Sequence, residues 1–80
     1  MTNLNDTRAE RARIALQSYV EAKGEVFENS SSEIADLMAD LLHLAVRTDE
    51  GEVAVVSALR LARLHFDAEH ENPEEDEGAA

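Results

Sequence analysis

The segment from Ser30 to Arg47 constrains the fold most strongly, because its apolar residues recur at helical spacing over about five turns. Ser30 and Glu33 form a Ser-x-x-Glu capping box, which is the usual signature of a helix start. Two neighbouring lines of this helix are apolar: Ile34, Leu37, Leu41 and Leu44 on one, and Ala35, Met38, Leu42 and Ala45 on the other. This apolar arc is wider than a surface helix needs. We therefore predict a helix over residues 31–47 that is covered on more than one side.

A helix is also predicted over residues 7–23. Thr7 and Glu10 form a second capping box at its start. Lys23 places a cation in the last turn, and Gly24 can take the positive φ that often ends a helix. The apolar positions expected to pack this helix against the rest of the chain are Ala12, Leu16 and Tyr19.

The third predicted helix covers residues 52–69. Asp49 and Glu52 repeat the capping spacing at its start. Two of its faces are apolar: Val55, Leu59, Ala62 and Phe66 form one, and Ala54, Leu61, Leu64 and Ala68 form the other. A three-helix domain this small cannot cover both faces, so we expect one of them to be buried against a second subunit or another protein.

Together these segments predict an all-α fold: a small antiparallel three-helix bundle, with a helical hairpin formed by the second and third helices and the first helix packed across it. We expect a frayed N-terminus over residues 1–6, a single helical domain over 7–69, and a disordered acidic tail over 70–80. In the first connection, Val26 and Phe27 are expected to tuck under the helices.

The charge balance excludes several classes of partner. The chain has 18 acidic and 7 basic residues, and its net charge is −11. This argues against direct binding to nucleic acid or to anionic membranes, which requires clustered Lys and Arg. The chain has no apolar run of membrane-spanning length and no signal-peptide pattern, so we expect a cytoplasmic protein without a membrane partner. The lack of cysteine excludes disulfides and thiolate metal sites.

One polar stripe of the second helix has the residue types of a metal site. This stripe consists of Glu33, Asp36, Asp40 and His43. These residues recur at steps of three and four, so their side chains could converge on a divalent ion. The interpretation we favour is a solvated helix face that binds no metal or other cofactor. The three histidines, His43, His65 and His70, form no His-x-x-x-His pair, and we expect packing or capping roles for them.

The sequence from Glu33 to Asp36 resembles the Glu-x-x-Asp element of the all-α nucleoside-triphosphate pyrophosphohydrolases. That resemblance implies Mg²⁺ held between helical acidic motifs and cleavage of nucleotides between phosphates. It covers only residues 33–47. The family's Glu-x-x-Glu motif should lie on a preceding helix, whereas its match here, Glu25 to Glu28, lies in a connection. A metal-dependent nucleotide hydrolase is therefore the third hypothesis, and we expect no catalytic residues.

The leading hypothesis is a noncatalytic helical module for protein–protein interaction that forms a homodimer. The predicted interface consists of Leu37, Leu41, Leu44, Leu61, Leu64, Arg60 and Arg63. The two arginines are expected at the rim, facing carboxylates such as Asp36 or Asp40 of the other chain. In a variant of this hypothesis, the same interface binds an unidentified protein partner. As a short helical chain with capping boxes and an acidic end, the protein resembles small orphan proteins carried by phages and plasmids. The alternative hypothesis is an acidic nucleic-acid mimic that inhibits a nucleic-acid-binding protein.

Overall fold

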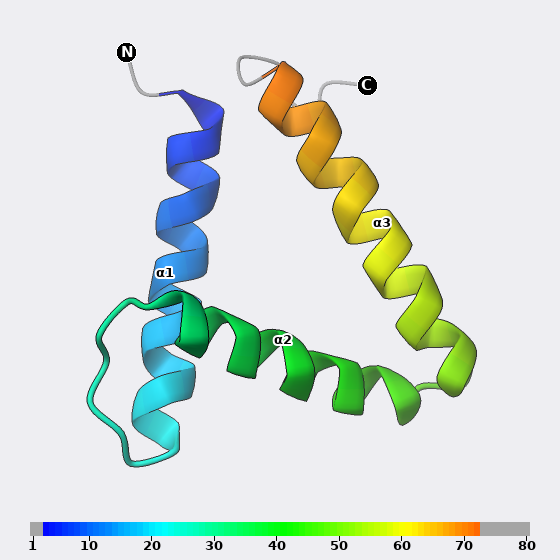
Figure 1. The fold of residues 1–80 in the computed structure, drawn as a ribbon, viewed down its shortest axis with the longest axis horizontal. Helices are drawn as coiled ribbons and strands as arrows, with labels where there is room; N and C mark the ends of the chain where they lie inside the picture. Colours follow the sequence, from blue (N-terminus) through cyan, green and yellow to red (C-terminus); the bar gives the residue numbers. More distant parts are fainter. Residues whose placement is uncertain (1–2, 73–80) are drawn as a thin grey trace.

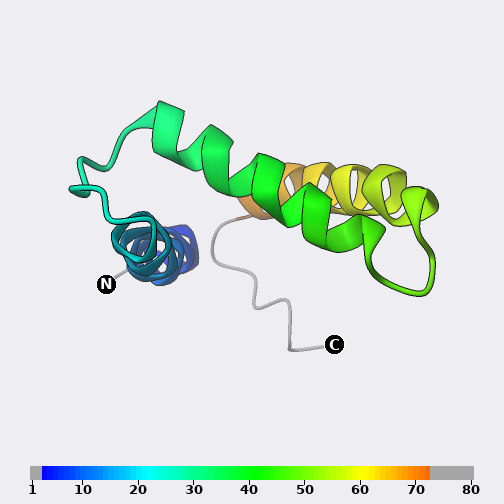
Figure 2. The same cartoon turned by 90° about the horizontal axis from the view of Figure 1, so that it is seen from below.

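The computed structural model describes residues 3–72, and these form three helices: α1 (Leu4–Ala22), α2 (Ser31–Val46) and α3 (Glu52–Glu71). This part of the chain has no strand, and the predicted all-α three-helix fold is confirmed. The predicted tail from residue 73 onward lies outside the described residues. The helices form three sides of an open frame (Figure 1), in which α2 joins α1 and α3 and the two outer helices run in opposite directions. Seen from below (Figure 2), α3 lies behind α2 in the line of sight and α1 is seen almost end-on, whereas Figure 1 shows that α3 diverges from α2 after the corner that joins them.

The start of α2 follows the sequence prediction. The Ser30 hydroxyl accepts a hydrogen bond from the backbone N–H of Glu33 at 3.2 Å, and the Glu33 carboxylate accepts one from the backbone N–H of Ser30 at 2.7 Å. The other carboxylate oxygen of Glu33 accepts from the backbone N–H of Glu28 at 2.9 Å. Glu33 therefore fixes both the first turn of α2 and the connection before it.

The predicted start of α1 at Thr7 is wrong, because the helix begins at Leu4 with Asn3 as its N-cap. The Asn3 side chain accepts a hydrogen bond from the backbone N–H of Asn5 at 2.6 Å. Residues 3–6 are therefore ordered as a cap and a first helical turn rather than frayed. Glu10, the second member of the predicted box, instead forms an ion pair with Arg13 at 2.6 Å.

The start of α3 at Glu52 agrees with the prediction, but Asp49 does not cap it. The N-cap is Gly51, which makes no side-chain hydrogen bond and has φ 61° and ψ −133°. The helix continues to Glu71, past the predicted end at residue 69, and the rings of Phe66 and His70 stack 5.4 Å apart in its last turns. The predicted boundary between the helical domain and the tail therefore lies too early.

The buried core is very small. Within residues 3–72 the buried side chains are Leu16 and Val20 of α1 and Ala54 of α3. Leu16 was predicted to pack, whereas Val20 was not among the positions of this helix that were expected to do so. Val26 was expected to tuck under the helices, but it is 81% exposed in the connection; its neighbour Phe27 is half-buried.

Polar contacts hold the frame together at its corners. The Tyr19 hydroxyl of α1 shares its single proton between two acceptors of α2, chiefly the Asp40 carboxylate and also the backbone carbonyl of Asp36 at 3.2 Å. At the open end of the frame, the Asn5 side-chain amide donates to the backbone carbonyl of Glu69 at 2.8 Å, and Arg8 forms an ion pair with the Glu69 carboxylate at 3.6 Å. Helix α1 is thus attached to α3 near its start and to α2 near its end.

Candidate interaction surface

Large apolar side chains are far more exposed than buried in this protein. In the described residues, 3–72, thirteen of them have exposed fractions between 40% and 81%. Five lie on α2 and six on α3: Ile34, Met38, Leu41, Leu44 and Val46, and Val53, Val56, Leu59, Leu61, Leu64 and Phe66. The predicted excess of apolar surface on these two helices is therefore present in the folded chain.

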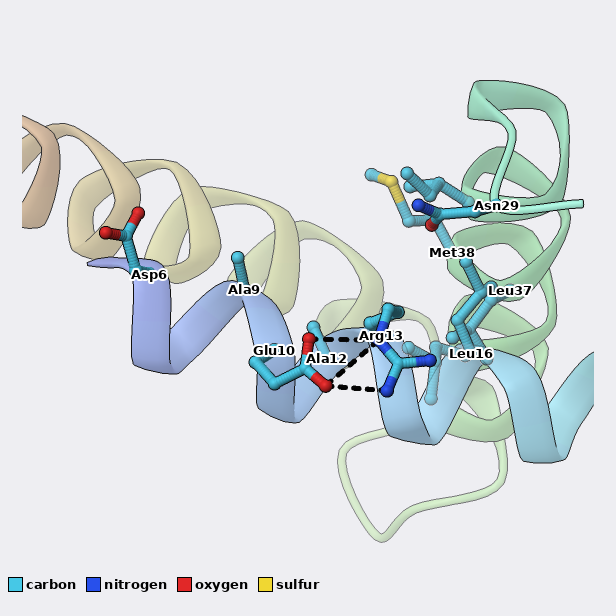
Figure 3. Close-up of a pocket in the computed structure, with 11 residues that line it drawn as sticks. Asp6, Ala9, Glu10, Ala12, Arg13, Leu16, Asn29, Leu37 and Met38 are labelled. Atoms are coloured by element: carbon cyan, nitrogen blue, oxygen red, sulfur yellow. Dashed lines mark hydrogen bonds and ion pairs between the residues drawn. The ribbon is translucent and has the colours of Figure 1, made fainter. Parts of the chain in front are cut away.

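The first apolar surface is a groove of about 540 Å³ between α1 and α2, which we call the α1–α2 groove (Figure 3). Its apolar lining is Ala9, Ala12 and Leu16 from α1 and Ile34, Leu37, Met38 and Leu41 from α2. The groove exists because α1 presents two alanines along this stretch, so that no long side chain fills the space in front of α2. Its edge is polar and consists of Asp6, Glu10, Arg13 and Asn29.

The second apolar surface lies on α3 and consists of Val53, Leu61 and Leu64, which we call the α3 ridge. Phe66 faces α1, because it lines a small hollow together with Asn5, Arg8 and Ala9. At 3.6 residues per turn, Leu64 lies about 200° and Leu61 about 140° around the helix from Phe66. The ridge therefore faces away from α1, and its three side chains are 64%, 44% and 53% exposed, in chain order.

The residues predicted to form one interface are distributed over these two surfaces. Leu37 is half-buried and Leu41 half-exposed in the groove, while Leu61 and Leu64 lie on the ridge. Leu44, which is 60% exposed, lies on α2 outside the groove lining. The groove is also lined by four residues that the predicted interface did not include: Ala9, Ala12, Ile34 and Met38. The signal that could have found it is the pair of alanines on the inner face of α1, opposite large side chains of α2.

The two predicted interface arginines have different surroundings. The Arg63 guanidinium pairs with the Asp67 carboxylate of the same helix at 3.0 Å. Arg60 is exposed and forms no ion pair within the described part of the chain. Asp6, on the edge of the groove, is likewise exposed and has no ion pair with any described residue. Arg60 and Asp6 are thus opposite charges that are free to pair with another molecule.

The polar stripe considered as a metal site has other roles in the fold. Glu33 belongs to the capping box, Asp36 lies 3.5 Å from the Lys23 ammonium, and Asp40 accepts the Tyr19 hydroxyl. The ammonium of Lys23 also sits 4.8 Å from the centroid of the Tyr19 ring. The hydrogen bond to Asp40, together with partial desolvation, raises the pKa of Tyr19. These contacts attach α1 to α2.

Across residues 3–72, no three His, Asp or Glu side chains are grouped so that they could hold a metal ion. Glu25 and Glu28, from the second motif of the hydrolase resemblance, line a shallow hollow with Glu33 and Asp36. Both of the latter carboxylates are already engaged by other residues of the chain. His43 and His65 are exposed on different helices, and His70 stacks on Phe66.

Comparison with known proteins places no constraint on this surface, since no family model, no curated protein and no solved structure matches the chain. Of the three helices in the described residues, none combines the length and the apolar character needed to cross a membrane.

Proposed function

We propose that this protein is a noncatalytic helical module for protein–protein interaction and that it forms a homodimer. The observation that supports the proposal is the imbalance between its core and its surface. Among residues 3–72, three buried side chains make the core, while thirteen large apolar side chains are substantially exposed. Soluble monomers rarely expose contiguous apolar surface of this extent, and self-association through a two-fold axis is the commonest way to cover it.

The energetics of such a dimer are favourable. Complete burial of one large aliphatic side chain contributes about 1.5–3 kcal/mol, so covering the exposed half contributes about 1 kcal/mol. With five or six such side chains on each of two protomers, the total reaches about 10–12 kcal/mol. This is comparable with the association cost of about 4–15 kcal/mol. At the low end of that cost, about 4 kcal/mol, the net gain approaches the roughly 8 kcal/mol that corresponds to a micromolar dissociation constant.

Sedimentation of the wild-type chain at micromolar concentration tests the proposal. We expect a species of twice the 8.8 kDa chain mass. Leu61→Asp should dissociate it, because a carboxylate on the α3 ridge cannot be buried without a partner. Ile14→Asp is the matched control. Ile14 is 56% exposed but lies about 200° around α1 from the buried Leu16, so this variant should remain dimeric.

Circular dichroism of both variants separates loss of association from loss of folding. A helical wild-type chain that sediments at 8.8 kDa over the whole micromolar range would refute the homodimer. The two apolar surfaces would then have to be assigned to a different protein.

A further inference from the structure

We infer that the α3 ridge of one copy occupies the α1–α2 groove of a second copy, and that the second copy's ridge occupies the groove of the first. This inference rests on the proposed homodimer and specifies which surfaces meet. It assigns the groove one occupant, the ridge formed by Val53, Leu61 and Leu64 of another chain.

The shape of the groove favours a helix as occupant. Ala9 and Ala12 place only methyl groups on the α1 side, so the backbone of an incoming helix can approach closely. The α2 side offers long, flexible or branched side chains, including Met38 and Leu41, which can pack between the ridge residues of a partner. A methionine in particular adapts to the side chains opposite it.

The chain's own α3 cannot fill the groove while the frame is intact. Ala54 is buried at the start of α3, and Glu69 near its end is bound by Asn5 and Arg8 of α1. With both ends attached, α3 is held as the third side of the frame (Figure 1). Its ridge faces away from α1, because Phe66 on the opposite face lines a hollow with residues of α1. A ridge that enters the groove must therefore come from another molecule.

Charge complementarity favours the α3 ridge as that partner, because the cation Arg60 lies only about 40° around the helix from Leu64. The other cation of this stretch, Arg63, pairs with Asp67 of the same helix. The charged residues on the groove edge are Asp6, Glu10 and Arg13, a net charge of −1. Glu10 and Arg13 pair with each other, which leaves the Asp6 carboxylate for an incoming cation. Arg60 is the α3 cation that has no partner within the described residues.

The arrangement also covers both the groove and the ridge of each chain. Each chain has one groove and one ridge, so a two-fold axis that places each ridge in the opposite groove makes the same contact twice and closes the assembly. Pairing groove with groove would leave both ridges in water. Pairing ridge with ridge would bring the arginines of two α3 helices together and leave both grooves open.

Disulfide mapping tests this pairing directly, because the chain contains no cysteine. Met38→Cys places a thiol in the groove and Leu64→Cys places one on the ridge. A disulfide needs Cα atoms about 4.4–6.8 Å apart, so it reports close contact. The two single variants are mixed, allowed to exchange subunits and then oxidised. We expect a cross-linked dimer from the mixture and little from either variant alone.

The control replaces the groove variant by Val26→Cys. Val26 is an apolar residue that is 81% exposed in the connection between α1 and α2, outside both surfaces. Its mixture with Leu64→Cys should give no cross-link above the background of the single variants. Circular dichroism confirms that each variant is folded before oxidation.

The double variant Met38→Cys/Leu64→Cys distinguishes association from closure within one chain. We expect a dimer joined by two disulfides, which runs at twice the monomer mass without reducing agent. A cross-linked monomer would mean that the chain's own α3 fills the groove, and would overturn the inference.

The remaining outcomes separate the inference from the proposed homodimer. Cross-links within a single variant, in a sample that sediments as a dimer, would overturn the ridge-in-groove pairing and leave the homodimer in place. A sample that sediments as a monomer would overturn both.

Discussion

The Asn5 side-chain amide on α1 donates a hydrogen bond to the backbone carbonyl of Glu69 on α3, across 64 positions of sequence. At 2.8 Å it joins the first turn of one helix to the last turns of the other and closes the open side of the frame. Together with the Arg8–Glu69 ion pair, it determines where α3 ends relative to α1.

Asn5→Ala should therefore loosen the end of α3. Removing a partly buried hydrogen bond of this kind costs about 0.5–1.5 kcal/mol, which corresponds to amide exchange in the last α3 turn that is about two- to tenfold faster. Thr7→Ala, an exposed position on the same helix, should leave those rates unchanged. If both variants accelerate exchange equally, the effect belongs to α1 helicity and not to the link with α3.

The connection between α2 and α3 supports a second prediction, at Gly51. Its φ of 61° and ψ of −133° lie in a region that residues with a Cβ atom strongly disfavour. No neighbouring atom lies within 4 Å of where a Cβ would be placed, so the cost of Gly51→Ala is purely conformational. We expect a loss of about 1–3 kcal/mol, which should lower the melting temperature of a domain this size by many degrees.

Ser57→Ala is the control for Gly51→Ala, since it introduces the same side chain two turns later, inside α3. Alanine is the most favourable helix residue, so this variant should melt close to the wild-type temperature or above it. An unchanged melting temperature in Gly51→Ala would mean that the connection has a different backbone conformation.

A third prediction concerns the pH dependence of the α2 cap. Hydrogen bonds from the backbone N–H groups of Ser30 and Glu28 lower the pKa of Glu33 below its ordinary value of 4.5. Because the folded-state pKa is the lower one, the ionised cap stabilises the fold above pH 4.5. This stabilisation is lost as the pH falls through the folded-state value.

Glu33→Gln removes the charge and keeps a hydrogen-bond acceptor. The difference in melting temperature between wild type and Glu33→Gln should therefore be largest near neutral pH and should shrink as the pH falls below 4.5. Glu50→Gln serves as the control, because that exposed carboxylate forms no hydrogen bond within the described residues. A constant difference across this range would show that ionisation of Glu33 does not contribute to the cap.

The sequence predicted those features of the fold that depend on neighbouring residues. The Ser30–Glu33 box is local, and it starts α2 as expected. The start of α1 was misplaced because the choice between Asn3 and Thr7 is reinforced by a contact between Asn5 and distant Glu69, which no local pattern contains. The exit direction of α3 depends on the dihedral angles of Gly51, and glycine permits many.

The sequence predicted only part of the candidate surface, because the rest depends on how distant segments are placed. Counting apolar positions on α2 and α3 indicated an excess over what three helices can cover, and the exposed fractions agree. The division into a groove and a ridge could not be predicted, because it depends on how widely the helices are splayed. In the sequence, Ala9 and Ala12 look like ordinary helix-forming residues. Their role in the groove becomes visible only when the position of α2 opposite them is known.

The last prediction concerns the charges that would accompany a ridge-in-groove dimer. Arg60 and Asp6 are exposed, opposite in charge and without ion pairs among the described residues. Asp36 and Asp40, the carboxylates expected from the sequence to face the arginines, are engaged by Lys23 and Tyr19. Asp6 of the second copy is therefore the better partner for Arg60.

A double-mutant cycle on the dimer dissociation constant tests this pairing. Arg60→Gln and Asp6→Asn should each weaken the dimer, and the double variant should weaken it no further than the stronger single one, because both remove the same ion pair. The coupling should fall as salt is raised, as expected for a solvent-exposed pair. Arg11→Gln, which removes the same charge from an exposed position on α1 about 140° around the helix from Leu16, should leave the dissociation constant unchanged. Additive effects of the two substitutions would show that Arg60 and Asp6 do not meet across the interface, and would remove the charge argument for placing the ridge of one copy in the groove of the other.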